Sequence, residues 1–174
     1  MTGYTWIHTS IKGLRLRHAG SEDAGVVLEF IKALAEYEKR SHEVCATTDD
    51  LSQQLGGGDF VDVVLADLNG ENVGFMLMFP SFSTFLGKRG IHLEDLFVIP
   101  QHRGLGIGHC LLSYAAKLTA SRGFGRLEWT VLDWNEPAIA FYRRLGAEPR
   151  SEWLIQQLSG DQLNVVARSF PASD

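Results

Sequence analysis

The chain has 174 residues, of which 45% are hydrophobic and 21% charged, and both fractions are ordinary for a globular protein. This length predicts a single domain over 1–174, with its core at about 14–168. The formal net charge of −5 disfavours nucleic acid as a partner, because phosphate backbones are bound by surplus positive charge. No apolar run approaches the ~18 residues of a membrane span, so we expect no membrane association.

Cysteine usage bears on metal binding and on cellular location. Cys45 and Cys110 are the only cysteines, and neither belongs to a CxxC or a Cys/His cluster. We therefore expect no metal site and no disulfide framework. Residues 1–12 lack the apolar core of a signal peptide, and together these features predict a cytoplasmic protein.

The first predicted elements are a strand and two helices. Apolar and polar residues alternate over 14–19, which predicts a strand, and Ser21–Asp23 then supply a helix N-cap with acids in the first turn. Apolar residues at three- and four-residue steps over 27–37 give this helix one buried face. The spacing over 47–50 resembles a capping box for a shorter helix, which the glycines at 56–58 end.

A run of β-rich segments follows. The segments 60–66 and 72–79 are joined across Asn69-Gly70, a dipeptide favoured where both turn residues take positive φ, so we predict a hairpin. A polar connector over 81–90 leads to a third strand over 91–99, which the next residue, a proline, closes.

The rest of the chain predicts alternating helices and strands. The expected elements are a helix over 107–118 that ends before Gly123, a strand over 126–132, a helix over 136–145 and a final strand over 152–158. The segment 159–168 fits either a short helix or a returning hairpin. This order predicts one α/β domain with a mixed sheet.

The stretch "QHRGLGIGH" at 101–109 stands between a strand and a helix. A helix start carries unpaired N–H groups and a partial positive charge, so it binds anions when side chains do not block them. Gly104, Gly106 and Gly108 remove that blockage, and Arg103 adds a charge for a pyrophosphate group. The alternative is a tight turn in which the glycines only satisfy backbone angles.

Two common phosphate-binding loops do not fit this stretch. A P-loop has Lys-Ser/Thr after its last glycine, whereas His109-Cys110 follows here. A dinucleotide fingerprint has the spacing G-x-G-x-x-G in a βαβ unit, whereas this loop has G-x-G-x-G after a hairpin and a third strand.

The loop instead resembles the acyl-CoA pyrophosphate loop of the GNAT N-acetyltransferase superfamily. The stretches "HLEDLFVIPQHRGLGIG", "VLDWNEPAIAFYRRLGA" and "KALAEYEK" resemble those of its spermidine/spermine and thialysine acetyltransferases. The similarity extends over 14–167. It implies a GNAT fold with a central, mostly antiparallel sheet flanked by helices, acetyl-CoA as co-substrate, and a homodimer, for which 153–158 is a candidate contact.

The resemblance also implies a set of residues that bind acetyl-CoA. In this family the strand before the loop separates from its neighbour, and its backbone groups bind the pantetheine arm and the thioester carbonyl. The matching positions on this strand, in the loop and on the later helix are Leu96, Phe97, Val98, Arg103, Gly104, Leu105, Gly106, Ile107, Gly108, His109, Asn135, Pro137 and Ala138. Asn135 fits the simple role of a helix cap equally well.

Tyr142 and Glu94 match the catalytic acid and base of the family. Tyr142 lies two helical turns after Asn135, so its hydroxyl is expected to reach the gap between the separated strands and to protonate the CoA thiolate. An alkylammonium of pKa near ~10.4 must lose a proton before it attacks, and Glu94 accepts it directly or through water. Without the resemblance, Tyr142 is a half-buried amphipathic aromatic and Glu94 a surface or ion-paired acid.

Further residues match positions that contact a cationic amine. They combine carboxylates with aromatic rings, which suits a cation, and they are Tyr37, Glu38, Glu128, Trp129 and Thr130. If strand pairing is regular, Asp95 points to the opposite face from Glu94. His92, His102 and His109 lack metal-ligand spacing, which is typical of surface or cap histidines.

The implied activity is transfer of an acetyl group to a primary amine of a small cationic substrate, by direct attack in a ternary complex. The candidate substrates are a polyamine, a diamine or a thialysine-like amino acid. The connector over 81–90 lacks the aspartate that polyamine-using members carry there, and Leu145 replaces a basic residue. The alternatives are a non-enzymatic acyl-CoA sensor, because a fold alone does not fix function, and an enzyme acting on protein amines.

Overall fold

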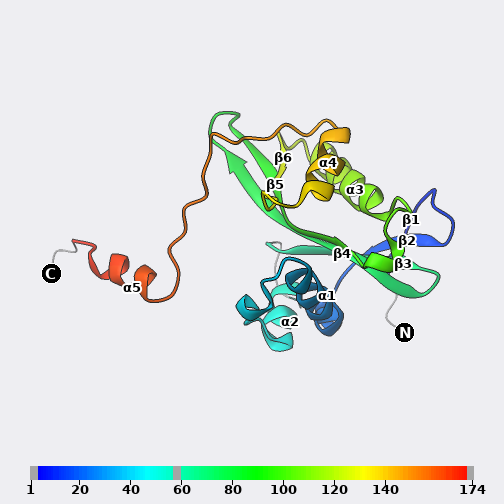
Figure 1. Ribbon diagram of the computed structural model, residues 1–174, viewed down its shortest axis with the longest axis horizontal. Coiled ribbons are helices and arrows are strands. Elements are labelled where there is room, and N and C mark those ends of the chain that lie inside the picture. Colours follow the sequence, from blue (N-terminus) through cyan, green and yellow to red (C-terminus); the bar gives the residue numbers. More distant parts are fainter. Residues whose placement is uncertain (1–3, 57–59, 172–174) are drawn as a thin grey trace. The chain divides into compact units, whose positions relative to one another are not determined.

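The computed structural model describes residues 4–56 and 60–171 (Figure 1). The described residues fall into two compact units that divide after Thr130. The single domain over 1–174 stays a prediction. None of the helices in the described ranges is long and apolar enough to cross a membrane.

The first unit contains one sheet, whose strands are hydrogen-bonded in their order along the chain. Neighbouring strands are antiparallel, except that β6 runs parallel to β5. The strands are β1 (Ile7–His8), β2 (Leu14–His18), β3 (Asp62–Leu68), β4 (Glu71–Ser83), β5 (Lys88–Val98) and β6 (Leu127–Trp129). The mixed, mostly antiparallel sheet is thus confirmed, and β1 is an addition that the sequence pattern did not predict.

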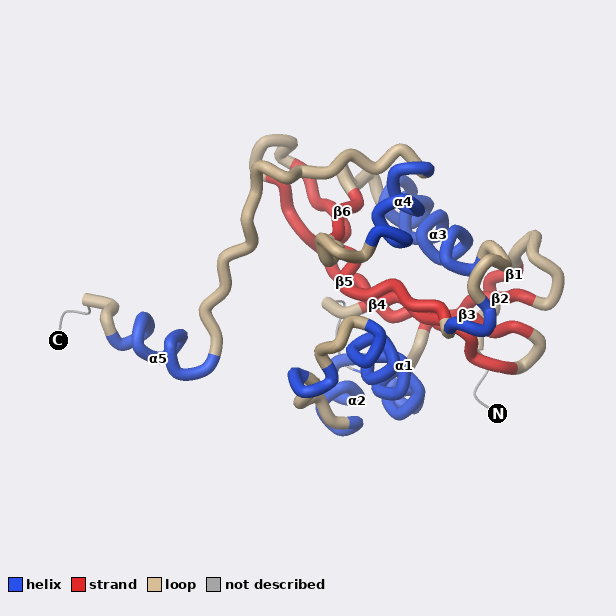
Figure 2. The backbone as a smooth tube through the Cα atoms, in the orientation of Figure 1, coloured by secondary structure: helices blue, strands red, loops and turns tan. Residues whose placement is uncertain are grey.

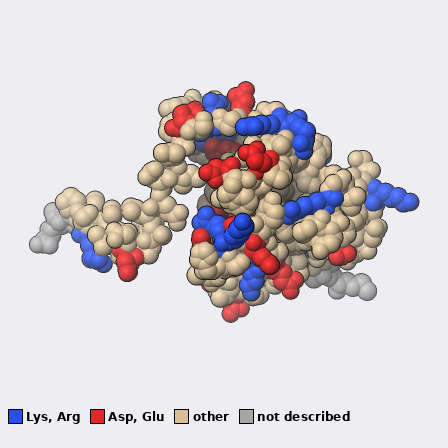
Figure 3. Space-filling view, viewed as in Figure 1, with Lys and Arg blue, Asp and Glu red and all other residues tan. Residues whose placement is uncertain are grey.

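Helices cover both faces of this sheet. The helices α1 (Ala24–Tyr37) and α2 (Thr48–Gly56) lie on one face, and α3 (Ile107–Ser121) lies on the other (Figures 1 and 2). The space-filling view shows Lys and Arg interspersed with Asp and Glu over the visible surface (Figure 3). The predicted start of α3 is confirmed; the helix extends past 118 to Ser121 and ends, as predicted, before Gly123, which has φ 67°.

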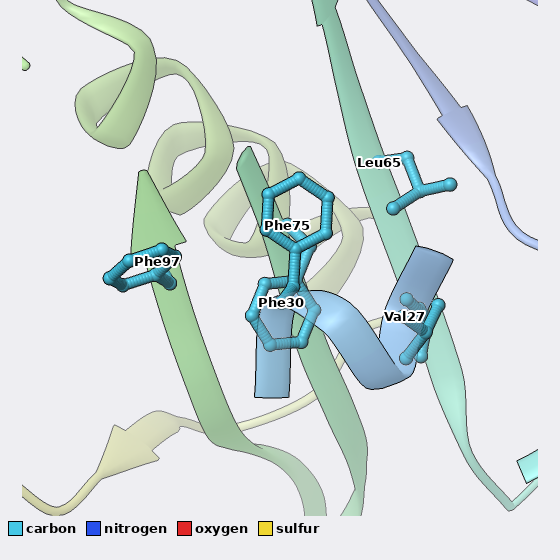
Figure 4. Packing of buried hydrophobic residues seen from close by; sticks show 6 residues of the cluster. Val27, Phe30, Leu65, Phe75 and Phe97 are labelled. Atoms are coloured by element: carbon cyan, nitrogen blue, oxygen red, sulfur yellow. The ribbon is translucent and has the colours of Figure 1, made fainter. Parts of the chain in front are cut away.

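The core on the α1 face is built from aromatic and aliphatic side chains. Phe30 of α1 stacks on Phe75 of β4, with ring centroids 5.2 Å apart. Val27, Val63, Leu65 and Phe97 complete the buried cluster (Figure 4). Because side chains alternate along a strand, the buried Met76 and Met78 of β4 point to the opposite face, which α3 covers.

The Asn69-Gly70 turn joins β3 and β4 as predicted, with φ 55° at Asn69 and φ 96° at Gly70. The hairpin of β4 and β5 extends further than predicted. Most of the polar connector over 81–90 belongs to these two strands, which pair as far as Ser83 and Lys88. Polar residues on an exposed part of a hairpin carry no hydrophobic pattern, which is why the connector was predicted as a loop.

Gly70→Ala should destabilise the first unit, because an L side chain at φ 96° costs roughly 1–2 kcal/mol. A matched control is Gly25→Ala in α1, where an added Cβ meets no atom within 4 Å. That change should stabilise the protein slightly, since alanine favours a helix over glycine. Chemical denaturation of both variants measures the two free energies, and equal shifts would contradict the role of the turn.

The first helix begins differently from the prediction. Residues Ser21–Asp23 form a 3-10 turn, and α1 begins at Ala24. No side-chain cap by Ser21 is formed; instead, the backbone N–H of Gly20 donates to Asp23 Oδ2 at 2.9 Å. The capping box of the second helix is confirmed, because Thr47 Oγ1 accepts from the N–H of Asp50 and Asp50 Oδ2 accepts from the N–H of Thr47.

The glycines that follow α2 are only partly described. The helix ends at Gly56, and 57–58 lie outside the described residues.

The second unit contains α4 (Glu136–Arg144) and α5 (Gly160–Arg168). The helix predicted over 136–145 is confirmed, and α5 settles the open choice for 159–168 as a helix. The strand predicted over 152–158 is wrong, because these residues form no ladder and are exposed. A strand needs a hydrogen-bonding partner, which an apolar pattern alone does not supply. The homodimer with a contact at 153–158 stays a prediction.

Candidate functional site

The glycine loop between β5 and α3 contains two backbone conformations that favour glycine. Gly104 has φ 80° and Gly106 has φ 83°. Gly108 is different, because it is the second residue of α3 and an added Cβ would meet only Val98 Cγ2, at 3.9 Å. Backbone angles therefore account for two of the three glycines, while the absence of a side chain at Gly108 has no such explanation.

The start of α3 presents unpaired backbone donors. The first helical hydrogen bond runs from the N–H of Cys110 to the carbonyl of Gly106, at 2.9 Å. The amides of Ile107, Gly108 and His109 therefore have no partner within the helix. No other part of the described chain offers an acceptor to them. This helix start can bind an anion.

The loop residues around these donors are ordered by other contacts. Arg103 Nε donates to the carbonyl of Val98 at 2.9 Å, and its guanidinium lies 4.6 Å from the ring centre of Tyr37. The contact from Arg103 to pyrophosphate that the sequence predicted stays a prediction. Leu105 is exposed, whereas His102 Nδ1 is buried without a hydrogen-bond partner in the described chain.

In the described chain, the side of β5 that faces β6 is free of strand pairing over its second half, and it is called the open side of β5 here. Strand β6 pairs with β5 only over Ile91–Leu93. The N–H of Ile99 bonds to Val73 on β4 at 3.0 Å, and backbone groups alternate in direction along a strand. The groups of Leu96 and Val98 therefore point to the open side, while those of Phe97 point to β4. This is the strand separation that the resemblance implied.

A β-bulge lies in β5 at the predicted base. Leu93 pairs with Met78 and Asp95 pairs with Leu77, so Glu94 is an extra residue without a partner on β4. The expectation that Asp95 points away from Glu94 depended on regular pairing, and it is wrong.

Contacts show which face the two carboxylates share. Asp95 lies beside Leu77, which packs against the core cluster on the α1 side. Glu94 Oε2 lies 3.6 Å from Nε2 of His92, whose ring stacks on Phe79 at 5.0 Å on that same side. The bulge thus brings two consecutive carboxylates to the face that carries α1.

The two carboxylates differ in environment. The Glu94 side chain is 56% exposed, whereas Asp95 is partly buried and forms no hydrogen bond or ion pair with the described residues. Burial raises the pKa of the Asp95 carboxyl to about 7, and the charges of Glu94 and Glu38 add to this effect. Burial also raises the pKa of Glu38, and the charge of Arg40 partly offsets it. Sequence reasoning missed Asp95 as a site residue.

The predicted substrate residues lie on two elements of the first unit. Tyr37 ends α1 and Glu38 follows as its C-cap, near enough to Asp95 for their charges to interact. Glu128 is already paired, because Oε1 accepts from Ser81 Oγ at 2.9 Å and lies 2.8 Å from an Arg126 nitrogen.

Trp129 is the last residue of β6, and Thr130 follows the strand.

The remaining predicted residues belong to α4 in the second unit. Asn135 is its N-cap, and Oδ1 accepts from the N–H of Ala138 at 3.4 Å. Pro137 lies in the first turn, where a missing N–H has no cost. Tyr142 lies within the helix and is partly buried. The cap role of Asn135 is therefore confirmed, while the catalytic role of Tyr142 stays a prediction.

Comparisons with known proteins agree with this arrangement. Residues 28–147 match the model of the acetyltransferase (GNAT) family. The chain is 33% identical over 165 residues to a thialysine N-epsilon-acetyltransferase of Mus musculus, covering 88% of this chain and 96% of the relative. It is 42% identical over 105 residues to an L-ornithine N5-acetyltransferase of Arabidopsis thaliana, covering 60% of this chain and 43% of that one.

Solved structures show the same fold. An integron cassette protein of V. cholerae has a TM-score of 0.75 at 24% identity, over 90% of this chain and 99% of that one. An aminoglycoside acetyltransferase from a soil metagenome, in complex with sisomicin, has a TM-score of 0.72 at 17% identity, over 84% and 97% of the two chains.

Proposed function

Because the chain belongs to the acetyltransferase (GNAT) family of enzymes, we propose that it transfers an acetyl group from acetyl-CoA to a primary amine of a small cationic substrate. The amine attacks the thioester directly in a ternary complex. The observation that carries this proposal is the row of unpaired amides at the start of α3, next to the open side of β5.

Acetyl-CoA fits the residues present at this site. The amides of Ile107–His109 and the bare backbone at Gly108 suit its pyrophosphate, as helix starts do in general. The backbone groups of Leu96 and the N–H of Val98 on the open side of β5 suit the pantetheine arm and the thioester carbonyl, while the Val98 carbonyl accepts from Arg103. Acetyl-CoA supplies an activated acetyl group, and a backbone donor stabilises the oxyanion that forms during its transfer.

The acceptor is a small amine that is cationic in solution. Glu38, Glu94 and Asp95 give the α1 face negative charge, and the rings of Tyr37 and Phe79 lie on the same side. The names of the relatives favour an amino acid with a terminal amine, such as thialysine or ornithine, over a long polyamine. The pairing of Glu128 with Arg126 also leaves less charge for a second ammonium group.

Two side chains are proposed to handle protons during transfer. One of the two carboxylates at the bulge accepts a proton from the ammonium group, and the resemblance favours Glu94. Tyr142 is proposed to donate a proton to the departing thiolate. Each function contributes roughly 10²–10⁴-fold to a rate.

An amine panel tests the proposal. Acetyl-CoA is supplied with thialysine, L-ornithine, spermidine and an aminoglycoside, and release of free CoA is measured. We expect turnover of at least one amine, and a lower kcat/KM in Glu94→Gln and in Tyr142→Phe, with folding checked by circular dichroism. Full activity in both variants would contradict the assigned roles. Binding of CoA without turnover of any amine would favour a non-enzymatic sensor.

A further inference from the structure

Because of the bulge at Glu94, the side chains of Glu94 and Asp95 lie on the same face of the sheet but in different environments. In a regular strand one of two consecutive side chains would point toward α3. The extra residue keeps Glu94 and Asp95 on the α1 face, and this face also carries the end of α1 with Glu38. The first unit thus places two chemically different acids next to the open part of β5.

We infer that Asp95 is the residue that binds the acceptor's ammonium group and takes up its proton, while the exposed Glu94 attracts the cation to the site. This inference rests on the proposed acetyl transfer and assigns the base within it. It requires Asp95 to contact the substrate nitrogen, and it makes Asp95 a catalytic residue.

The surroundings of Asp95 support this role. Its carboxylate is partly buried beside Leu77 and has no hydrogen-bond or ion-pair partner in the described chain, so a bound ammonium group would be its first partner. Among the described residues, the charged and titratable groups on the same side include Glu94 and His92 from β5, Tyr37 and Glu38 from α1, and Arg103 from the loop. The side chain opposite on β4 is apolar.

The acid strength of Asp95 suits a base that works near neutral pH. With a pKa of about 7, raised first by burial and then by the charges of Glu94 and Glu38, the carboxylate holds a proton more tightly than an ordinary aspartate. A base is most effective when its pKa lies near the working pH. Burial is the main cause of this raised pKa, and it does not act on a carboxylate that is exposed to solvent.

The proton balance of the step is complete. The nitrogen of the ammonium group loses two protons in becoming an amide. One passes to Asp95, which frees the lone pair to form the bond to the thioester carbon, and Asp95 later releases it to solvent. The C–S bond breaks with its electron pair on sulfur. The second proton leaves to solvent, and the thiolate takes up one proton, for which Tyr142 is the proposed donor. Tyr142 regains its proton from solvent, so that the reaction releases one proton overall.

Steady-state kinetics of the full chain with thialysine and L-ornithine tests the assignment. Asp95→Asn should lower kcat by about 10²–10⁴-fold, and Asp95→Glu should recover part of it. The rate of the unaltered enzyme should fall below about pH 7, as the base becomes protonated, and this fall should be absent in Asp95→Asn. Glu94→Gln should raise KM and keep the pH dependence, while Glu71→Gln, an exposed acid on β4, should change neither.

The outcomes separate this inference from the proposed function. A normal kcat and an unchanged pH dependence in Asp95→Asn would overturn the inference while leaving acetyl transfer intact. If the unaltered chain acetylates no amine, the proposed function fails. Binding of thialysine, followed by NMR, then still tests Asp95: at least a tenfold weaker affinity in Asp95→Asn supports the contact, and equal affinity overturns it.

Discussion

Gly108→Val is expected to weaken acetyl-CoA binding by about 10–1000-fold while leaving the protein folded. A side chain at the second residue of α3 would shield the amides of Ile107–His109, and each charge-assisted hydrogen bond to a phosphate contributes roughly 1.5–3 kcal/mol. Folding should be preserved, because a Cβ added at Gly108 meets only Val98 Cγ2, at an ordinary distance of 3.9 Å. The measurements are the Kd for CoA by calorimetry and the KM for acetyl-CoA.

The matched control is Gly25→Val, because Gly25 is likewise the second residue of a helix and an added Cβ there has no neighbour within 4 Å. Both changes alter helix propensity in the same way, so the control isolates the effect of shielding. Gly108→Ala should give an intermediate loss of affinity. Unchanged CoA binding in Gly108→Val would show that these amides do not hold the cofactor, and the tight-turn interpretation of the loop would then stand.

Asp23→Ala is expected to reduce the free energy of unfolding by about 3–5 kcal/mol, because it leaves the buried guanidinium of Arg17 without its counter-charge. Asp23 accepts two hydrogen bonds from Arg17, at 2.6 and 2.7 Å, and a third from the N–H of Gly20. The guanidinium also lies 3.9 Å from the ring centre of Tyr4. Urea denaturation measures the loss.

The same pair predicts a dependence of stability on pH. Burial alone would raise the pKa of Asp23, but the hydrogen bonds from Arg17 and Gly20 outweigh it and lower the pKa below 3.8. A carboxyl with a lowered folded pKa stabilises the protein above pH 3.8, and this stabilisation is lost as the pH falls through the folded pKa. In Asp23→Ala, the free energy of unfolding should therefore fall less steeply as the pH is lowered.

Two further variants test the account of the Arg17 pair. Glu43→Ala removes an exposed carboxylate from Arg40 and should leave the unfolding midpoint almost unchanged. Adding Arg17→Met to Asp23→Ala should recover much of the lost stability, since the unpaired buried charge is then gone. If the double variant is no more stable than Asp23→Ala, lost packing rather than lost charge compensation explains the effect.

Features set by local chemistry could be predicted from the sequence. Asn69-Gly70 specifies its turn by backbone conformation, and the glycine loop with its helix follows from residues close together in the chain. The cap of α4 by Asn135 was predictable for the same reason. The anion-binding end of the site therefore depends on short-range signals that one sequence displays.

Features that depend on pairing between distant strands were harder to predict from the sequence. The strand expected over 152–158 had an apolar pattern, but no pattern reveals whether a partner exists. The bulge at Glu94 did leave a trace, because Ile91 and Leu93 occupy the α3 side before it and Leu96 and Val98 occupy that side after it. This change from odd to even positions was the signal that would have placed Asp95 beside Glu94.

Because of the bulge, the number of residues in β5 decides which side chains face α1 and which face α3, just as their identity decides how they pack. Removing one residue at position 94 would restore strict alternation, but it would turn one end of the strand over relative to the other. Either Phe97 would leave the aromatic layer under α1, or Leu93 would leave the layer under α3. A point replacement in this strand therefore changes the packing of one side chain. A deletion of one residue would instead move several side chains from one face of the sheet to the other.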